Sequence, residues 1–379
     1  MKTFLPNYKD GSVVNLISSI KTAFGQQSLY ENLKDLPSES IDSRNIILFM
    51  IDGLGYDYVE KNSKSFLFKH LKGKITSVFP SSTAPCVTSF FTGLSPSEHM
   101  ITGWYMYSKE IGTTSMPLPY ITRLGRIPVS LKIKSEKFFK QSTIFNNINS
   151  YILLPEDLAT SDYNKTLCKK AKLVAYNGLT DFFKKINKII SKDRRKKYIY
   201  AYWPDFDILC HLYGKKSKES LKNFRKLDKE ILKFSKKLKD TTIIVTADHG
   251  HIDTVKSRTI VLNKHPKVIE CLERPLSGET RVAYCYVKPT FQRKFEKYIK
   301  KTFSHACDLY KSQYIAKKGW FGPNVSKELL ERIGDYILIM KDNYVIKDII
   351  IGEIDRPFIG NHGGVSEEEM FVPLIVIKK

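Results

Sequence analysis

Two short motifs in this sequence pair a carboxylate with an imidazole. Asp207 and His211 are four residues apart, so one turn of helix would carry both on the same face, a spacing that suits a shared metal ion. Asp248 and His249 are adjacent and precede Gly250, where a tight turn can direct both side chains at one ion. Each motif is a candidate metal site, and an ordinary structural Asp–His pair is the alternative for the first.

Other potential ligands accompany these pairs. Asp205 is a rival to Asp207, but its offset from His211 points it elsewhere. His251 adds an imidazole, which we expect to support a ligand or lie at the surface more often than to bind an ion itself. Asp52 ends a hydrophobic run just before a glycine, and a plain turn residue is the alternative interpretation there. Oxygen and nitrogen ligands thus recur along the chain.

One hydroxyl, that of Thr83, is the candidate nucleophile in the stretch 76–99. Residues 77–79 predict a short strand that Pro80 ends, and the apolar residues after Thr83 predict a helix that ends at Gly93. We therefore expect Thr83 to be the N-cap of this helix, where free backbone N–H groups and the positive end of the helix dipole favour an anion such as phosphate. The simpler alternative is that Thr83 only caps the helix.

Short runs that are hydrophobic on both faces predict the strands that must position these residues. The runs are residues 45–55, 198–203, 241–247 and 371–377. The predicted amphipathic helices cover residues 13–24, 165–192 and 217–239. Asp52, Asp207 and Asp248 stand at or just after the ends of the first three runs. Because ligands collect at the carboxyl ends of strands in open α/β sheets, we expect these carboxylates to meet at one edge of a mostly parallel sheet flanked by helices.

Residues 256–347 interrupt the alternation of strands and helices. The elements predicted there are a strand at 281–287, an amphipathic helix at 291–303 and a segment at 328–340 that passes from helix to strand. The polar motifs resume only at 360–364, which contain His362 between glycines. We expect a core formed by residues 1–255 and 348–379, and a small inserted α+β lid formed by residues 256–347.

The composition is that of a basic globular protein. The chain has 379 residues, of which 42% are hydrophobic, and its 62 Lys and Arg against 39 Asp and Glu leave a net charge of +23. Such a charge attracts anionic small molecules, nucleic acid or acidic membranes. Most of the lysines are spread over predicted helix faces, which indicates a solvated basic surface. The densest run, 192–197, reads as an exposed corner, and no nucleic-acid-binding motif accompanies it.

The cysteines and the first residues bear on the cellular compartment. The six cysteines form no C-x-x-C pair and no tight framework, which is typical of a reduced intracellular protein. The apolar residues within 1–20 are interrupted by Pro, Asn, Lys, Asp and Gly, so neither a signal peptide nor a membrane span is predicted. We expect a cytoplasmic protein, although secretion without a cleavable signal would leave no trace here.

Taken together, the motifs resemble those of a known family. In order, they are IDGLGYD, FPSSTAPCVTSFFTGL, YWPDFDILCHLYG, TADHGH and GNHGG. The ordered set resembles the alkaline phosphatase superfamily and, within it, the bacterial and archaeal branch of the type I phosphodiesterase and nucleotide pyrophosphatase group. This resemblance implies an alkaline-phosphatase-like α/β sandwich with a central, mostly parallel sheet.

The resemblance also implies two divalent metal ions, for which we expect zinc, with manganese as the alternative. It assigns one ion to Asp207, His211 and His362. It assigns the other ion to Asp52, Asp248 and His249, together with Thr83 as the nucleophile. A threonine hydroxyl is a poor nucleophile at neutral pH, and coordination to a dication favours its alkoxide. The implied reaction passes through a covalent phospho-threonine, which water then hydrolyses.

The sequence departs from the eukaryotic-type members of that group around the nucleophile. Those members carry Lys before the nucleophile and Phe-Pro-Asn after it, whereas Ser82 precedes Thr83 here and Cys86 replaces the Asn that helps to hold a phosphate oxygen. Ser82 is therefore a minor alternative nucleophile. The segments 278–281 (GETR) and 320–323 (WFGP) resemble features of the bacterial and archaeal branch. For the first, a lid contact to the leaving group and a structural Glu–Arg pair are both open.

Three functions compete for this chain. The first is a phosphodiesterase or nucleotide pyrophosphatase that acts on a small anionic phosphoester. The second is a phosphomonoesterase or phosphonate hydrolase with the same metals, while a phosphoglycerate mutase is weaker because that branch generally uses Ser and a differently placed insertion. The third is an inactive, basic nucleic-acid-binding protein on the same scaffold. The presence of every expected ligand argues against the third.

Overall fold

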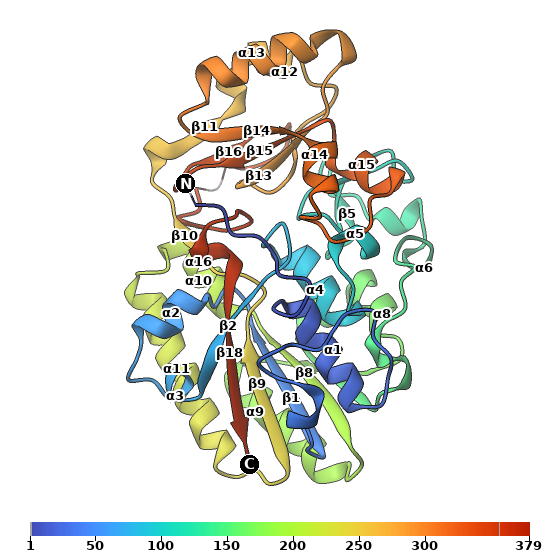
Figure 1. Cartoon of the computed structure of the whole chain (residues 1–379), viewed down its shortest axis with the longest axis vertical. Helices are drawn as coiled ribbons and strands as arrows, with labels where there is room; N and C mark the ends of the chain where they lie inside the picture. The colour runs from blue at the N-terminus through green and yellow to red at the C-terminus, as the bar shows by residue number, and fades with distance from the viewer. Residues whose placement is uncertain (1, 356) are drawn as a thin grey trace.

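Seven strands form the central sheet of the molecule (Figure 1). The computed structural model describes residues 2–355 and 357–379. In spatial order the strands are β2 (Leu71–Thr76), β18 (Phe371–Lys378), β9 (Thr241–Thr246), β1 (Asn45–Ile51), β8 (Lys197–Trp203), β6 (Ser150–Pro155) and β7 (Lys172–Tyr176). Only β18 runs antiparallel to its neighbours, β2 and β9. The expected α/β fold with a mostly parallel sheet is therefore confirmed.

Strand β1 lies at the centre of this sheet, and all seven of its residues are buried. It pairs in parallel with β8 on one side and β9 on the other, so that Ile51 lies beside Trp203 and Met50 beside Thr246. Parallel strands in register end at the same edge of a sheet. The residues that follow β1, β8 and β9 therefore emerge side by side. The hydrophobic character of the three strands on both faces is typical of such central parallel strands.

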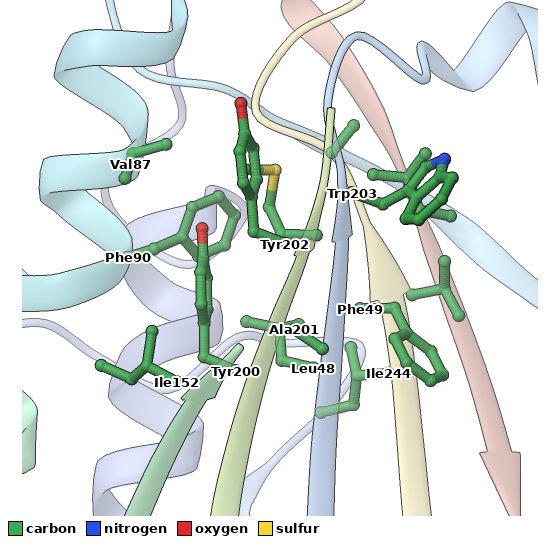
Figure 2. Close-up of a cluster of buried hydrophobic side chains, with 14 of the residues drawn as sticks. Leu48, Phe49, Val87, Phe90, Ile152, Tyr200, Ala201, Tyr202, Trp203 and Ile244 are labelled. Carbon is green, nitrogen blue, oxygen red and sulfur yellow. The ribbon is translucent and has the colours of Figure 1, made fainter. Parts of the chain in front are cut away.

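Helices cover both faces of the central sheet. On one face, Phe49 of β1 contacts Phe182 of α9 (Gly178–Lys192) and Phe234 of α11 (Lys218–Ser235) at ring distances of 5.7 and 6.0 Å. On the other face, Tyr200 of β8 contacts Phe91 of α4 (Thr83–Thr92) at 5.2 Å, and α1 (Val13–Ala23) lies against α4. Figure 2 shows Phe49 and Tyr200 on opposite sides of the strands, with Phe90 of α4 beside Tyr200. Helix α4 is thus held firmly by its apolar residues.

Two local predictions were wrong. Residues 165–192 do not form one helix, because β7 separates α8 (Asp162–Leu167) from α9 and pairs in parallel with β6. The pairing with β6 overrides the helical spacing of the lysines. Residues 77–79 do not form a strand either, because β2 ends at Thr76 and the Ser77 hydroxyl donates a hydrogen bond to the Asp248 carbonyl instead. This bond ties the approach to α4 to the end of β9.

A second, four-stranded sheet lies over the edge at which the central parallel strands end (Figure 1). Its antiparallel strands are, in order, β12 (Ser277–Gly278), β13 (Val282–Cys285), β15 (Tyr336–Met340) and β14 (Cys307–Lys311). Helix α13 (Gln292–Thr302) packs against it through Phe295 and Ile299, in a hydrophobic cluster separate from the main core. Helices α14 (Ser312–Lys317) and α15 (Lys327–Ile333) contribute to a third cluster together with Phe79. The predicted strand and helix at 281–303 are thus present.

Small sheets connect the loops around this edge. Strand β10 (Ile252–Asp253) pairs with β17 (Gly360–Asn361), which brings the residues after β9 beside the residues before His362. Strands β3 (Met106–Ser108), β4 (Thr113–Met116) and β5 (Ile121–Thr122) form a further sheet, and β11 (Thr259–Val261) pairs with β16 (Val345–Lys347).

Within residues 2–355 and 357–379, no helix has the length and apolar character needed to cross a membrane.

A buried ion pair fastens the second sheet to the core. Nε and Nη2 of Arg281 donate to the two carboxylate oxygens of Glu369 at 3.0 and 2.9 Å, and both side chains are fully buried. Glu369 also accepts hydrogen bonds from Gly364 N and the Ser366 hydroxyl. Arg281 therefore does form a structural pair with a glutamate. Its partner is Glu369, and Glu279 of the segment 278–281 takes no part in the pair.

The Arg281–Glu369 pair gives a first prediction. Replacing Arg281 by Met leaves the Glu369 carboxylate buried without its cation, so we expect the free energy of unfolding to fall by about 3–5 kcal/mol. Urea denaturation followed by circular dichroism measures this change. The control is Lys294→Met, which breaks the exposed Lys294–Glu270 pair and should cost less than about 1 kcal/mol. Equal stability of the two variants would contradict the role given to Arg281.

Candidate active site

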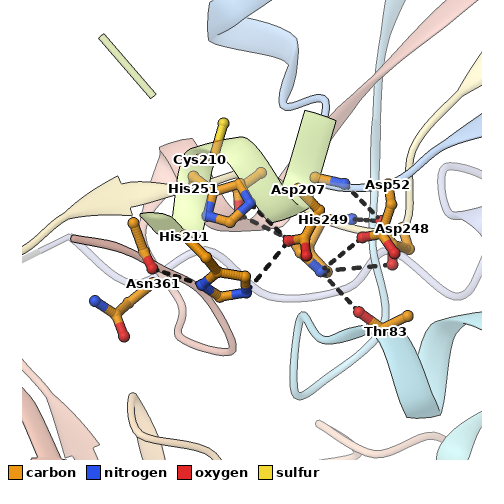
Figure 3. Close-up of polar contacts among 12 residues, drawn as sticks. Asp52, Thr83, Asp207, Cys210, His211, Asp248, His249, His251 and Asn361 are labelled. Atoms are coloured by element: carbon orange, nitrogen blue, oxygen red, sulfur yellow. Dashed lines mark hydrogen bonds and ion pairs between the residues drawn. The ribbon is translucent and has the colours of Figure 1, made fainter. Parts of the chain in front are cut away.

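The central strands deliver three carboxylates to one place (Figure 3). Asp52 follows β1, and Asp248 follows β9 after one residue. Asp207 lies in the first turn of α10 (Asp205–Tyr213), which begins two residues after β8. Helix α10 forms where the hydrophobic strand gives way to Pro204 and two acidic residues, which suit the positive N-terminal end of a helix. The parallel register of β8, β1 and β9 thus brings together side chains that are far apart in the sequence.

Asp52, Asp248 and His249 form the first cluster, in which the potential ligand atoms lie within 4.8 Å of one another. His249 Nε2 is 3.4 Å from Asp52 Oδ1 and 3.5 Å from Asp248 Oδ2. His249 Nδ1 lies 3.1 Å from the Gly250 carbonyl, which assigns the proton to Nδ1 and the lone pair to Nε2. The nitrogen lone pair therefore points at the two carboxylates.

Each carboxylate of this cluster has one anchored oxygen and one free oxygen. Tyr202 donates its hydroxyl proton to Asp52 Oδ2, while Gly53 N and His249 N donate to Asp248 Oδ1 at 3.1 and 3.0 Å. Asp52 Oδ1 and Asp248 Oδ2 are buried without a hydrogen-bond partner. Burial, and then the charges of Asp248 and Asp207, raise the pKa of Asp52 well above its ordinary value. Unpartnered carboxylate oxygens beside an imidazole lone pair fit a divalent cation.

Asp207, His249 and His362 form the second cluster, again with ligand atoms within 4.8 Å of one another. His249 therefore belongs to both clusters. The rings of His249 and His362 stack at 3.6 Å, and burial is the first cause that lowers the pKa of His362 well below its ordinary value. A neutral imidazole is the form that binds metals. The second cluster thus also fits a cation.

His211 lies beside the second cluster as the expected partner of Asp207. Its Nε2 is 3.4 Å from Asp207 Oδ1, and its Nδ1 lies 2.7 Å from the Gly360 carbonyl. Its ring centroid is 5.1 Å from that of His362. The Gly360 carbonyl accepts the Nδ1 proton, so Nε2 is left to face Asp207. The group of three whose potential ligand atoms all lie within 4.8 Å of one another nevertheless contains His249 in place of His211, and the His249 and His362 rings stack on each other.

Thr83 contacts the histidine that the two clusters share. Its Oγ1 is 3.2 Å from His249 Nε2, and the residue is 8% exposed. The prediction that Thr83 is the N-cap was wrong by one residue. Ser82 has the extended N-cap backbone, with φ −144° and ψ 155°, and Thr83 begins α4. Thr83 is thus the first residue of α4, at the end of the helix where the backbone N–H groups lack intrahelical partners.

The residues around Thr83 take other roles. The Cys86 thiol is fully buried in the main core, and burial raises its pKa well above the ordinary value. Cys86 therefore does not replace the expected Asn as a phosphate contact. Ser82 is fully buried as well, and its hydroxyl has no hydrogen-bond partner. Of the two adjacent hydroxyls, that of Thr83 is the one in contact with His249.

His251 supports a carboxylate, which is one of its expected roles. Its Nε2 is 2.8 Å from Asp207 Oδ1, and its ring is almost fully buried. Gly53, at φ +72°, passes so close that an added Cβ would lie 2.5 Å from His251 Nε2. Asp205 starts α10 and belongs to neither cluster. The choice of Asp207 over Asp205 thus agrees with the geometry.

Sequence reasoning missed Tyr202, which anchors Asp52. The only signal was its place in the aromatic run at 198–203, where alternate side chains point to opposite faces of the sheet. That pattern does not identify which tyrosine hydroxyl reaches a carboxylate on the neighbouring strand.

Comparisons with known proteins identify a family over most of the chain. The family model described as type I phosphodiesterase / nucleotide pyrophosphatase matches residues 46–364, which include all seven candidate residues. A search of the curated proteins found no match.

Solved structures share the fold at low sequence identity. Murine ectonucleotide pyrophosphatase / phosphodiesterase 5 is 19% identical, with a TM-score of 0.63 over 88% of each chain. The human protein of the same name is also 19% identical, with a TM-score of 0.64 over 88% of this chain and 87% of that one. Phosphonoacetate hydrolase from Sinorhizobium meliloti 1021 is 19% identical, with a TM-score of 0.63 over 89% of this chain and 91% of that one. On the family match, the chain belongs to the type I phosphodiesterase / nucleotide pyrophosphatase family of metal-dependent phosphoric ester hydrolases.

Proposed function

We propose that this protein is a two-metal phosphodiesterase or nucleotide pyrophosphatase that cleaves a small phosphodiester or nucleotide through a covalent phospho-threonine. One observation carries the proposal. The Thr83 hydroxyl lies 3.2 Å from His249, the imidazole common to the two clusters of potential ligands. A hydroxyl in that position can be activated without a dedicated general base. The net charge of +23 favours an anionic substrate.

We propose zinc for both ions, with Asp52, Asp248 and His249 holding one, and Asp207, His211 and His362 holding the other. Histidine nitrogens and carboxylate oxygens suit zinc, and manganese is the alternative where oxygens predominate. The free oxygens of Asp52 and Asp248 support the fit. When bound, such a pair of dications supplies Lewis acidity that favours the threonine alkoxide and neutralises phosphate charge.

The chain's own residues then carry the two displacements. Thr83 Oγ1 attacks phosphorus, its proton passes to solvent, and the bond from phosphorus to the leaving oxygen breaks. Water next attacks the phospho-threonine, the bond from phosphorus to Thr83 Oγ1 breaks, and the threonine regains a proton. Free N–H groups in the first turn of α4 can stabilise a phosphate oxygen throughout. Two inversions give net retention at phosphorus.

Two similar structures bear on the substrate. An inactive threonine-to-alanine form of the murine phosphodiesterase is in complex with AMP, which supports a nucleotide as the substrate here. Phosphonoacetate hydrolase, in complex with phosphonoacetate, supports a phosphonate or phosphomonoester as the second candidate. We place the nucleotide or small diester first because the family description names that chemistry. The gathering of all expected ligands disfavours an inactive nucleic-acid-binding protein.

We also propose that residues 256–347 form a cap over a core of residues 1–255 and 348–379. The separate hydrophobic cluster around α13 and the position of the four-stranded sheet support this division. The compartment we infer is the cytoplasm or another reducing one, since all six cysteines are buried and none forms a disulfide.

Substitution of Thr83 tests the nucleophile. In the zinc-loaded protein, Thr83→Ala should lower kcat for bis-p-nitrophenyl phosphate by roughly 10³-fold or more, because the covalent route is lost. Thr83→Ser should keep measurable turnover. The matched control is Ser82→Ala, which removes the neighbouring hydroxyl and should stay within a few-fold of wild type. Wild-type turnover by Thr83→Ala would exclude the proposed mechanism.

Metal removal tests the ligand assignment. Because metal binds only the folded clusters, zinc at about 100 times its dissociation constant should stabilise the chelated protein by about 2.7 kcal/mol for each occupied site. Thermal unfolding with and without zinc measures the gain, and elemental analysis should find two ions per chain. Asp248→Asn should lose much of the gain, whereas Asp253→Asn, outside both clusters, should keep it. Identical melting curves with and without zinc would refute the metal sites.

A further inference from the structure

Glu279 is a carboxylate from the second sheet that lies at the candidate active site. It occupies the turn between β12 and β13, and it packs against the backbone of Gly363, the residue after His362. A Cβ added at Gly363, whose φ is +105°, would lie 2.7 Å from Glu279 Cβ. Burial raises the pKa of Glu279, and on its other side the Ser82 hydroxyl is close enough to offset part of that rise. The carboxylate thus stands between the neighbour of Thr83 and the neighbour of His362.

The turn that carries Glu279 is held rigidly. Trp104 N donates a hydrogen bond to Glu279 Oε1 at 2.7 Å, and Tyr105 N donates to the Gly278 carbonyl at 3.1 Å. Arg281, two residues further on, is bound to Glu369. A side chain on so constrained a backbone keeps its position when a ligand binds.

Glu279 has no cation to balance it within the described part of the chain. Although Arg281 is two residues away, its guanidinium is engaged by Glu369, and none of the ion pairs of residues 2–355 and 357–379 includes Glu279. The carboxyl is half-buried, and burial raises its pKa to about 7. In a chain of net charge +23, an uncompensated acid at the mouth of an anion site is unusual.

We propose that Glu279 is a specificity-determining residue that faces the ester substituent of the bound phosphate and selects phosphodiesters over phosphomonoesters. The inference rests on the proposed phosphoesterase function. A phosphodiester carries one negative charge, whereas a phosphomonoester carries nearly two at neutral pH. A fixed carboxylate repels the extra charged oxygen of the monoester, while the second substituent of a diester meets it without that repulsion. A substituent that bears a hydroxyl or amino group can also donate a hydrogen bond to it.

Turnover of matched substrates by Glu279→Gln tests this role. Gln keeps the size of the side chain and an oxygen for Trp104 N, but removes the charge. The assay uses zinc-loaded protein at about pH 8.5, where the wild-type carboxyl is ionised. The ratio of kcat/KM for bis-p-nitrophenyl phosphate to that for p-nitrophenyl phosphate should fall at least about tenfold in the variant, through a gain on the monoester. A nucleoside p-nitrophenyl phosphate reports whether a donor on the substituent adds to this.

Glu270→Gln is the matched control, because this substitution makes the same chemical change at an exposed position of the same segment. It should leave the ratio unchanged. An unchanged ratio in Glu279→Gln, or an equal loss on both substrates, would overturn the specificity role.

A binding measurement separates this inference from the proposed function. Inorganic phosphate, a dianion at about pH 8.5, should bind the zinc-loaded Thr83→Ala/Glu279→Gln protein about tenfold more tightly than Thr83→Ala alone, by calorimetry. This readout needs no turnover. Equal affinities would overturn the inference. If the double variant binds phosphate more tightly but the wild-type protein hydrolyses none of the substrates, only the proposed function is overturned.

Discussion

The convergence of three carboxylates at one end of a parallel sheet governs the other contacts of this structure. Asp52 and Asp248 are buried, Asp207 is partly buried, and the three leave neighbouring strands to meet where water screens their charges poorly. Such a concentration of like charge is costly in a hydrophobic fold unless hydrogen bonds and cations compensate it. The surrounding imidazoles and the single anchored oxygen on Asp52 and on Asp248 are physical answers to that cost.

The second sheet is subject to a related constraint. It adds Glu279 to a region that already contains these acids, yet it is fastened there by a paired charge, Arg281 with Glu369. Because Glu369 also binds Gly364 N, the same ion pair steadies the loop that carries His362. Buried polar contacts therefore join Arg281 of the second sheet to the loop that carries His362.

Sequence patterns predicted a helix or strand correctly where the local preference of the segment agreed with its contacts to distant parts of the chain. The runs at 45–55, 198–203 and 241–247 became β1, β8 and β9, and Asp207 and His211 lie on one helix as their spacing indicates. The pattern misled at 165–192, where spacing alone indicated a helix but pairing with β6 produced β7. The N-cap at Ser82 instead of Thr83 shows the usual uncertainty of one residue at a helix end.

The sequence by itself determined the set of chemical groups, the strands that end beside them and the ordered motifs that indicate the family, because these depend on residue type and short-range spacing. Only the tertiary structure decided how those groups combine. It placed His249 in both clusters, brought the Tyr202 hydroxyl to Asp52, paired Arg281 with Glu369 and placed Glu279 beside Ser82 with a hydrogen bond from Trp104 N. These partners lie up to 197 positions apart, and the contacts between them follow from strand register and loop packing, which no local pattern encodes.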